Sequence, residues 1–265
     1  KIAVIDGDRQ LTFSELAERV ATLAAHLKEC GVERDKIVPI FTPRCLEFVI
    51  AYIAVLTAGG AYLPLEIGYP IQQLARIISE CKPVIVLASE SFCERLPKDT
   101  NCFTLTEGWE KQFEGRSREG IPVLVDIDDL AYCVYSSGTT GEPKGILCPH
   151  RGAVLSYTHR SKIAPYSTNE REACNVFFVW ELLRPLLNGA TLVVVPDHVI
   201  YDPSALLELL EKQRVTRMLF TPSLIEAVIN SPALDESTIR TAFQYFRVIV
   251  LCGETVTRKL RNQIL

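Results

Sequence analysis

One segment constrains this chain more than any other: an apolar strand runs directly into a loop rich in glycine and hydroxyl side chains, followed by one lysine. The strand is predicted over Leu130–Tyr135. The glycines of the loop permit positive φ angles and a close approach of backbone N–H groups to an anion. The loop residues that offer backbone freedom, hydroxyl donors or positive charge are Ser136, Ser137, Gly138, Thr139, Thr140, Gly141, Lys144 and Gly145. The segment therefore predicts a phosphate-binding loop.

Two other interpretations of this loop fit less well. A P-loop requires glycine, lysine and then Ser or Thr in direct succession, whereas Glu142 and Pro143 separate Gly141 from Lys144 here. A solvated linker rich in Ser, Thr and Gly would rarely follow a strand as apolar as this one.

The run 130–145 resembles the signature loop of the adenylate-forming superfamily, which includes acyl-CoA synthetases, luciferases and the adenylation domains of nonribosomal peptide synthetases. Leu11–Leu16 and Leu56–Glu66 resemble two further motifs of the peptide-synthetase branch, in the order that the family requires. The first also predicts a helix start with a capping box between Thr12 and Glu15, and the second a helix that ends at glycine. The resemblance covers essentially the whole chain, as the N-terminal part of an adenylation domain of a peptide synthetase or a carboxylic acid reductase.

This resemblance implies an adenylate-forming ligase that uses ATP and Mg²⁺. A carboxylate attacks the α-phosphorus of ATP, pyrophosphate leaves, and the acyl-AMP is opened by a phosphopantetheine thiol on a partner carrier-protein domain. Such catalysis consists mostly of positioning and charge neutralisation around the phosphates. By the same resemblance, the β- and γ-phosphates would be held by Ser136, Ser137, Gly138, Thr139, Thr140, Gly141 and Lys144.

The resemblance also implies that further catalytic motifs lie beyond Leu265, including a ribose-binding Asp and a small C-terminal domain with a mobile lysine. No catalytic residue is therefore assigned within the chain. Gly253 and Glu254 resemble a turn of the family that borders the adenine and substrate pockets. Glu254 is explained equally well as a carboxylate stabilised by the dipole at a helix N-terminus.

Substrate choice is predicted to rest on Asn175–Glu181, where the chain departs from the family pattern. Domains that activate α-amino acids typically show Phe-Asp-x-Ser-x-Trp-Glu, in which the Asp pairs with the substrate ammonium. Trp180 and Glu181 fix the register, so Val176 stands at the position of that Asp. A buried ammonium beside valine would lose its charge partner, which costs several kcal/mol. An ordinary α-amino acid is therefore disfavoured.

Two substrate classes remain open. One is a neutral aryl, keto or hydroxy acid in an apolar pocket. The other is a quaternary ammonium acid such as glycine betaine, which binds aromatic faces at about 0.5–2 kcal/mol per contact. Phe177 and Trp180 would form two walls of such a cage, whereas Phe178 is better explained as core. By their match to pocket positions of the family, the lining residues are Val176, Phe177, Trp180, Leu219, Val250 and Cys252.

Two other functions also remain open. A free-standing acyl-CoA synthetase would use the same loop with CoA as acceptor, although Leu182–Leu192 resembles the carrier-protein branch more closely. The alternative from another class is a non-catalytic nucleotide-binding module. Carboxylate-dependent exchange between ATP and pyrophosphate separates these functions.

Composition and charge argue against nucleic acid and membranes as partners of this chain. The chain has 265 residues, 48% of them hydrophobic, and a formal net charge of −4, so it can bury a large core and is a poor match for nucleic acid. Its longest apolar stretch, Phe48–Ala58, is too short to span a bilayer, so no membrane partner is predicted. No signal peptide is visible, and because the first residue is Lys1 rather than Met, we expect sequence upstream of it.

Nine cysteines occur without a C-x-x-C pair, a pattern that favours a reducing compartment and predicts a cytoplasmic location. The four histidines do not stand at metal-ligand spacing with the cysteines, so neither a structural nor a catalytic zinc site is predicted.

Alternating helical and strand periodicities predict a layered α/β fold. The resemblance implies the αβα N-terminal body of an adenylate-forming enzyme, without its small C-terminal domain. A first α/β subdomain is predicted over residues 1–105, a long surface connection over 106–129, and a second α/β subdomain with the phosphate loop over 130–265. Helices are expected at 13–30, 44–58, 72–81, 150–158, 179–187, 203–212 and 223–229, and strands at 38–41, 84–87, 191–195, 217–221 and 247–252.

Overall fold

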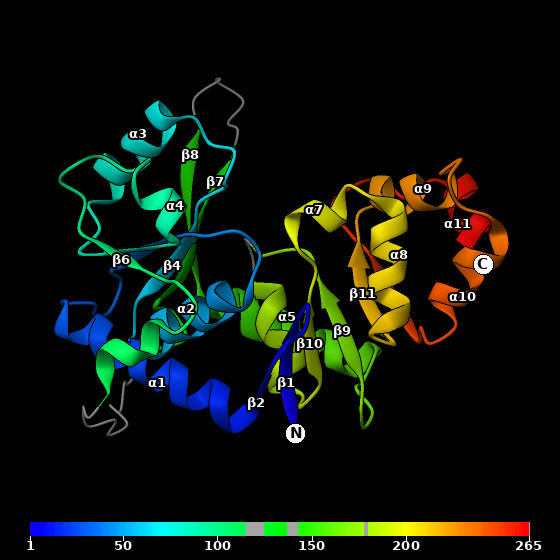
Figure 1. Ribbon diagram of the computed structural model, residues 1–265, viewed down its shortest axis with the longest axis horizontal. Helices are drawn as coiled ribbons and strands as arrows, with labels where there is room; N and C mark the ends of the chain where they lie inside the picture. The colour runs from blue at the N-terminus through cyan, green and yellow to red at the C-terminus, as the bar shows by residue number, and fades with distance from the viewer. Residues whose placement is uncertain (115–124, 137–142, 178–179, 265) are drawn as a thin grey trace. The chain divides into compact units, whose positions relative to one another are not determined.

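The structure, a computed structural model, describes residues 1–114, 125–136, 143–177 and 180–264, without the side chains of Ser136 and Trp180. It is a mixed α/β protein with two sheets (Figure 1). The chain divides into two compact units, each described here by itself. Unit 1 comprises residues 1–11, 161–177 and 181–265, and unit 2 comprises residues 12–160 and 178–180.

Unit 2 holds a six-stranded sheet in the order β6-β5-β3-β4-β7-β8. Its strands are β3 (Ile37–Phe41), β4 (Ala61–Pro64), β5 (Val86–Ala88), β6 (Cys102–Thr104), β7 (Leu130–Ser136) and β8 (Lys144–Pro149). Its helices are α1 (Phe13–Glu29), α2 (Leu46–Thr57), α3 (Ile71–Cys81), α4 (Glu90–Cys93), the 3-10 helix η1 (Trp109–Phe113) and α5 (His150–Ile163). The pairing is parallel apart from β7 with β8, which is antiparallel.

The helices of unit 2 bury apolar residues. The capping box that starts α1 is confirmed: the Glu15 N–H donates to Thr12 Oγ1 at 3.2 Å, and the Thr12 N–H donates to Glu15 Oε2 at 2.8 Å. Helix α2 is apolar over most of its surface and is buried. Helix α3 buries Leu74 and Ile77 in one cluster with Phe41 of β3.

The prediction of a surface connection over residues 106–129 is wrong for its described first part. Trp109 and Phe113 lie in η1 with 2% and 5% of their surface exposed. Phe113 stacks in a tilted arrangement on His26 of α1, with ring centroids 5.1 Å apart. This short helix was not predicted, because polar residues separate the two aromatic residues. Two apolar residues alone are too few to establish a helical period.

Unit 1 holds the second six-stranded sheet, in the order β12-β11-β9-β10-β1-β2. Its strands are β1 (Ile2–Asp6), β2 (Arg9–Thr12), β9 (Arg171–Cys174), β10 (Thr191–Val194), β11 (Arg217–Phe220) and β12 (Val248–Leu251). Its helices are the 3-10 helix η2 (Trp180–Leu182), α6 (Leu183–Leu187), α7 (Asp197–Ile200), α8 (Pro203–Lys212), α9 (Pro222–Ile229), α10 (Glu236–Phe243) and α11 (Arg258–Ile264). The pairs from β12 through β11, β9 and β10 to β1 are parallel.

One face of this sheet carries the main apolar core of unit 1. Met218 and Phe220 of β11 pack there in one cluster with Leu206 and Leu210 of α8, and Figure 1 shows α8 running beside β11. Because side chains alternate along a strand, Arg217 and Leu219 project from the opposite face. The predicted substrate residues of these two strands, Leu219 of β11 and Val250 of β12, lie on that opposite face.

The boundaries of the two units differ from those predicted. Residues 130–160 cluster with residues 12–114, not with the second half of the chain, and the boundary falls inside α5. Residues 2–6, predicted to lie in the first subdomain, form strand β1, which pairs with β10 through Val4 and Leu192. Sequence periodicity contains no information about a pairing between residues so far apart in the chain, so this difference could not be foreseen.

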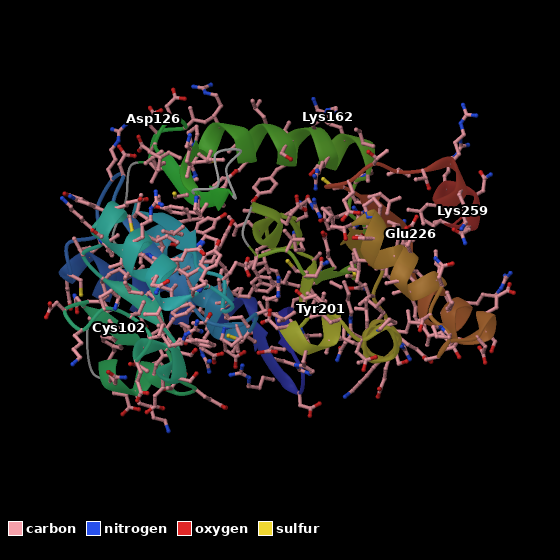
Figure 2. The ribbon with its side chains drawn as sticks, turned by 90° about the horizontal axis from the view of Figure 1, so that it is seen from above. Cys102, Asp126, Lys162, Tyr201, Glu226 and Lys259 are labelled. Carbon is pink, nitrogen blue, oxygen red and sulfur yellow. The ribbon has the colours of Figure 1, made fainter. Side chains whose placement is uncertain are left out.

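Helix α5 has one buried residue, Ala153, and its exposed residues include Lys162, which Figure 2 labels. No helix in the described residues is long and apolar enough to cross a membrane.

Candidate functional site

The predicted phosphate loop connects the two antiparallel strands β7 and β8. Ser136 and Lys144 are register partners at the ends of these strands. Residues 137–142, which include Ser137, Gly138, Thr139, Thr140 and Gly141, lie outside the described residues. Lys144 is exposed, and its Nζ makes no hydrogen bond or ion pair within the described part of the chain. The ammonium group is therefore open to an anion.

Close packing at the base of the loop explains why glycine follows the lysine. A Cβ atom added to Gly145 would lie 3.2 Å from Cζ of Tyr135 and 3.4 Å from Sγ of Cys133. The Tyr135 hydroxyl donates to Oε2 of Glu80 at 2.9 Å, which holds the ring in place. Gly145 thus lets β8 lie against a fixed tyrosine.

The sheet in unit 1 contains a point at which the order of successive strands reverses. Strands β9 and β11 are parallel neighbours, yet β9 is followed by β10 on one side and β11 by β12 on the other. In open parallel sheets, ligands bind outside the carboxyl ends of strands at such a switch point. Asn175–Phe177 follow β9 directly, and Thr221–Ser223 follow β11.

Most predicted substrate residues reach this edge. Leu219 of β11 and Val250 of β12 are register partners near the ends of their strands. Val176 is partly buried and Phe177 is buried, while Cys252 is exposed just beyond β12. The Trp180 side chain lies outside the described residues.

Glu254 is engaged by the start of a helix. Its Oε2 accepts from the Ser223 N–H at 3.0 Å and its Oε1 accepts from the Ser223 hydroxyl at 2.6 Å. Ser223 lies in the first turn of α9, where a carboxylate is stabilised by unpaired N–H groups and by the helix dipole. Gly253 before it has a φ of +94°, which glycine adopts without strain. The helix-terminus interpretation of Glu254 therefore has a direct structural basis.

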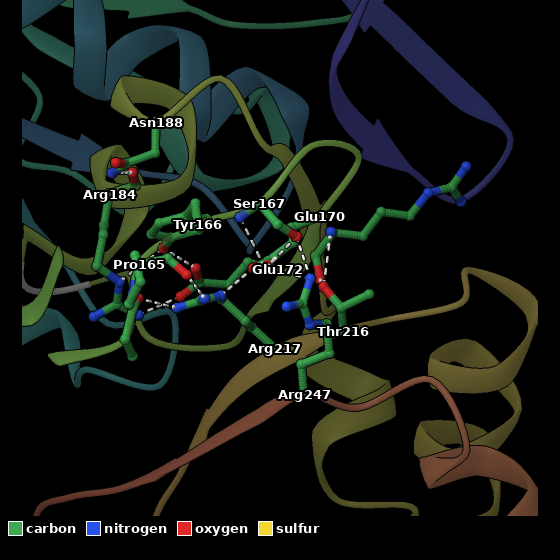
Figure 3. Close-up of polar contacts among 12 residues, drawn as sticks. Pro165, Tyr166, Ser167, Glu170, Glu172, Arg184, Asn188, Thr216, Arg217 and Arg247 are labelled. Atoms are coloured by element: carbon green, nitrogen blue, oxygen red, sulfur yellow. Dashed lines mark hydrogen bonds and ion pairs between the residues drawn. The ribbon is translucent and has the colours of Figure 1, made fainter. Parts of the chain in front are cut away.

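A buried cluster of charges that sequence reasoning missed includes Glu172, which precedes Asn175–Glu181 in the sequence, and Arg184, which follows it (Figure 3). The Arg184 guanidinium donates to Glu172 through Nη2, forms an ion pair from Nη1 to Glu181 Oε2 at 2.5 Å, and donates from Nε to the Tyr166 hydroxyl at 3.1 Å. The Tyr166 hydroxyl in turn donates to Glu172. Each of the three charged side chains is at most 6% exposed.

A second buried arginine continues this cluster. Arg217 donates to Glu170 and, at 2.9 and 2.8 Å, to the carbonyls of Ala164 and Pro165. Its guanidinium carbon lies 4.0 Å from the centroid of the Tyr166 ring, which is cation–π geometry. The buried carboxylates and guanidiniums are thus paired in charge, and Arg184 Nη1 meets Glu181 as an ion pair without a hydrogen bond.

These charges shift the pKa values of their neighbours. Burial alone would lower the pKa of Arg184, but Glu172 and Glu181 outweigh that effect and raise it. Burial, reinforced by the charge of Glu172, raises the pKa of the Cys174 thiol to about 12. Cys174 is therefore a neutral thiol at physiological pH, and Arg184 is a permanent cation.

Other features in the described ranges do not join this site. No group of three or more His, Cys, Asp or Glu in these ranges could hold a metal ion. A cavity of about 680 Å³ is lined mainly by apolar residues of α9, α10 and α11, together with Ile249 of β12. Ile249 lies in the apolar core of unit 1, and the predicted pocket residues do not line this cavity.

Comparisons with known proteins bear on the family of the chain. The family model described as "AMP-binding enzyme" matches residues 1–265. The chain is 40% identical over 264 residues to glycine betaine reductase ATRR from Emericella nidulans, covering 99% of this chain and 20% of that protein. It is 32% identical over 263 residues to tyrocidine synthase 2 from Brevibacillus parabrevis, covering 97% of this chain and 7% of that protein. The chain therefore spans a fifth or less of these relatives.

Solved structures show the same architecture. The nonribosomal peptide synthetase FmoA3, in a form bound to alpha-methyl-L-serine-AMP, superposes with a TM-score of 0.86 at 27% identity, covering 99% of this chain and 29% of that one. ATP-bound MatB from Rhodopseudomonas palustris superposes with a TM-score of 0.85 at 22% identity, covering 99% of this chain and 54% of that one. The second likeness concerns the fold alone.

Proposed function

The chain belongs to the family of AMP-binding enzymes, and from this premise we propose that it activates a quaternary ammonium carboxylic acid as its acyl-adenylate. The substrate carboxylate oxygen bonds to the α-phosphorus of ATP, the bond from that phosphorus to the bridging oxygen breaks, and pyrophosphate leaves. The match of the family model over the whole chain supports the reaction class. The residue that supports the substrate class is Val176.

The loop between β7 and β8 would hold the ATP phosphates. Lys144 stands at its outgoing end with an ammonium free of described partners, which suits a polyphosphate. Ser136, Ser137, Gly138, Thr139, Thr140 and Gly141 remain predicted phosphate contacts. Mg²⁺ is bound in such sites by one or two carboxylates together with substrate phosphates and water. Mg²⁺ bound in this way would neutralise part of the phosphate charge beside Lys144.

The substrate class follows from the end of β9. Val176 takes the place where amino-acid-activating domains carry an acidic residue, so an ammonium with N–H groups would lie there without an acceptor. A trimethylammonium group has no N–H to satisfy and is attracted by aromatic faces. The relative that is 40% identical carries the name glycine betaine reductase, which favours a glycine betaine-like acid over an aryl or keto acid.

Transfer of the acyl group to a carrier-protein phosphopantetheine thiol is part of the same proposal. Its support is the similarity to tyrocidine synthase 2 at 32% identity, together with the Leu182–Leu192 segment. A CoA thiol is the competing acceptor.

Carboxylate-dependent exchange of labelled pyrophosphate into ATP by the full-length protein tests the reaction. We expect glycine betaine to support more exchange than α-amino acids, aryl acids or keto acids. Exchange dominated by ordinary α-amino acids would refute the role given to Val176, and no exchange with any acid would refute adenylation.

The proposed aromatic cage can be tested separately from adenylation. Glycine betaine should be preferred over its neutral tert-butyl isostere, because only the cation is attracted to ring faces. Replacing Trp180 with Leu should weaken use of the cation by about 1–2 kcal/mol and affect the isostere much less. Equal use of both acids by the wild-type protein would exclude the cage and leave adenylation standing.

A further inference from the structure

Arg184 joins two carboxylates that flank one segment of the chain. Glu172 belongs to β9 and precedes the predicted pocket residues Val176 and Phe177, and Glu181 belongs to η2 and follows them. The Arg184 guanidinium contacts both carboxylates, and the three side chains are at most 6% exposed. The arginine therefore ties the strand before the segment to the helical turn after it.

A guanidinium suits this position because its nitrogen atoms point in fixed, separate directions. Nη1 meets Glu181, Nη2 meets Glu172, and Nε donates to the Tyr166 hydroxyl at 3.1 Å. Tyr166 also donates to Glu172, so this carboxylate is fixed from two sides. A lysine ammonium, as a single point charge, could not reproduce these three directions.

From this geometry we infer that Arg184 is a positioning residue for the acid site: by holding Glu172 and Glu181 together it places Val176 and Phe177 at the carboxyl edge of the sheet. The inference rests on the proposed function of that edge as the acid pocket. Without the cation, two buried carboxylates would be left without a shared partner, and the two ends of the segment would separate.

Arg217 provides a matched control. Its side chain is 7% exposed and its partner Glu170 is 2% exposed, so its burial resembles that of Arg184. Its other contacts are the carbonyls of Ala164 and Pro165 and the ring of Tyr166, so it touches neither Glu172 nor Glu181. Loss of Arg217 leaves the tie between these two carboxylates in place, so it should destabilise the fold and disturb Val176 and Phe177 less than loss of Arg184 does.

Steady-state pyrophosphate exchange with Arg184→Met and Arg217→Met in the full-length protein separates positioning from stability. We expect Arg184→Met to raise KM for the acid by about tenfold or more, with KM for ATP changed by less than about twofold. Arg217→Met should lower the active fraction and leave both KM values within about twofold. A purely structural role of Arg184 would instead give a lower kcat with KM for the acid unchanged.

Arg184→Lys covers the case in which the methionine variant does not fold. It keeps the positive charge but reaches fewer partners, so KM for the acid should rise by a smaller factor. A wild-type KM for the acid in a folded Arg184→Lys protein would overturn the inference, because charge alone would then suffice.

Hydrogen exchange measured by mass spectrometry gives a readout that does not depend on the acid. Amides of Asn175–Phe177 and Glu181–Leu183 should exchange faster in Arg184→Met and in Arg184→Lys, and should be unchanged in Arg217→Met. Faster exchange in a protein that adenylates no acid would refute the proposed function and leave the tie between the segment ends intact. Normal pyrophosphate exchange with unchanged KM and unchanged amide exchange would refute the positioning role alone.

Discussion

At the scale of single residues, Lys144 has the feature that a phosphate contact needs. It is exposed at the start of β8, directly after the predicted loop. Replacing Lys144 with Ala should weaken the use of ATP by about 1–3 kcal/mol, the contribution of a charge-assisted contact. Pyrophosphate exchange at limiting ATP measures the effect. Lys162→Ala, on the exposed face of α5, removes the same charge elsewhere and should change nothing; equal effects would take Lys144 out of the phosphate site.

Two cysteines of unit 1 differ in reactivity for physical reasons. Cys174 is 5% exposed and burial raises its pKa to about 12, whereas Cys252 is exposed. Because the thiolate is the reactive form, iodoacetamide at pH 8 should modify Cys252 in the native protein and Cys174 only after unfolding. Peptide mass spectrometry reads both sites in one sample. Rapid labelling of native Cys174 would contradict its burial at the end of β9.

At the scale of elements, α10 begins at a carboxylate that titrates. Asp235 Oδ1 accepts from the Thr238 N–H at 2.7 Å and from the Ser237 hydroxyl at 2.8 Å, and these bonds, the backbone bond first, lower the pKa of Asp235. A lowered pKa means that the stabilisation is present above the ordinary Asp value of about 3.9 and is lost as the pH falls through the lower folded value.

Thermal unfolding across pH tests this cap. Asp235→Ala should lower Tm at pH 7, and the difference from wild type should shrink as the pH falls below about 4. Asp235→Asn keeps an acceptor oxygen that does not titrate, so its Tm difference from Asp235→Ala should stay constant with pH. A pH-independent difference between wild type and Asp235→Ala would assign the effect to helix propensity instead.

Element prediction succeeded where local signals were strong and failed where they were weak or contradicted by burial. Pro203–Lys212 is observed as predicted, with Asp202 as its N-cap. Helix α10 was not predicted, although Asp235 and the Glu236–Arg240 pair are recognisable start and spacing signals. Strand β9 was not predicted because Arg171 and Glu172 look like surface residues. Only their partners in the folded chain make them compatible with a sheet interior.

At the scale of the whole molecule, each unit has its own apolar core, and the two cores should respond separately to a cavity. Phe220 and Phe41 are both fully buried, the first in the main core of unit 1 and the second in unit 2. Replacing either with Ala should cost about 3–5 kcal/mol. Phe220→Ala should reduce amide protection in β9–β12, and Phe41→Ala in β3–β5. Equal loss of protection across both sheets in either variant would show that the two cores unfold together.

The sequence alone determined the α/β class and the capped helices, and it predicts a phosphate loop directly after the strand Leu130–Tyr135 and a substitution at Val176 that bears on the substrate. Each of these depends on neighbours within about twenty residues, where periodicity, capping and turn chemistry act. Tertiary structure alone decided that β1 pairs with β10, that residues 130–160 belong with the first half of the chain, and that Arg184 joins Glu172 to Glu181. These pairings form between segments whose local patterns are unrelated. They form because strands must pair their backbone hydrogen-bonding groups and buried charges must be paired with opposite charges. Both conditions arise only when distant segments come together in the folded chain.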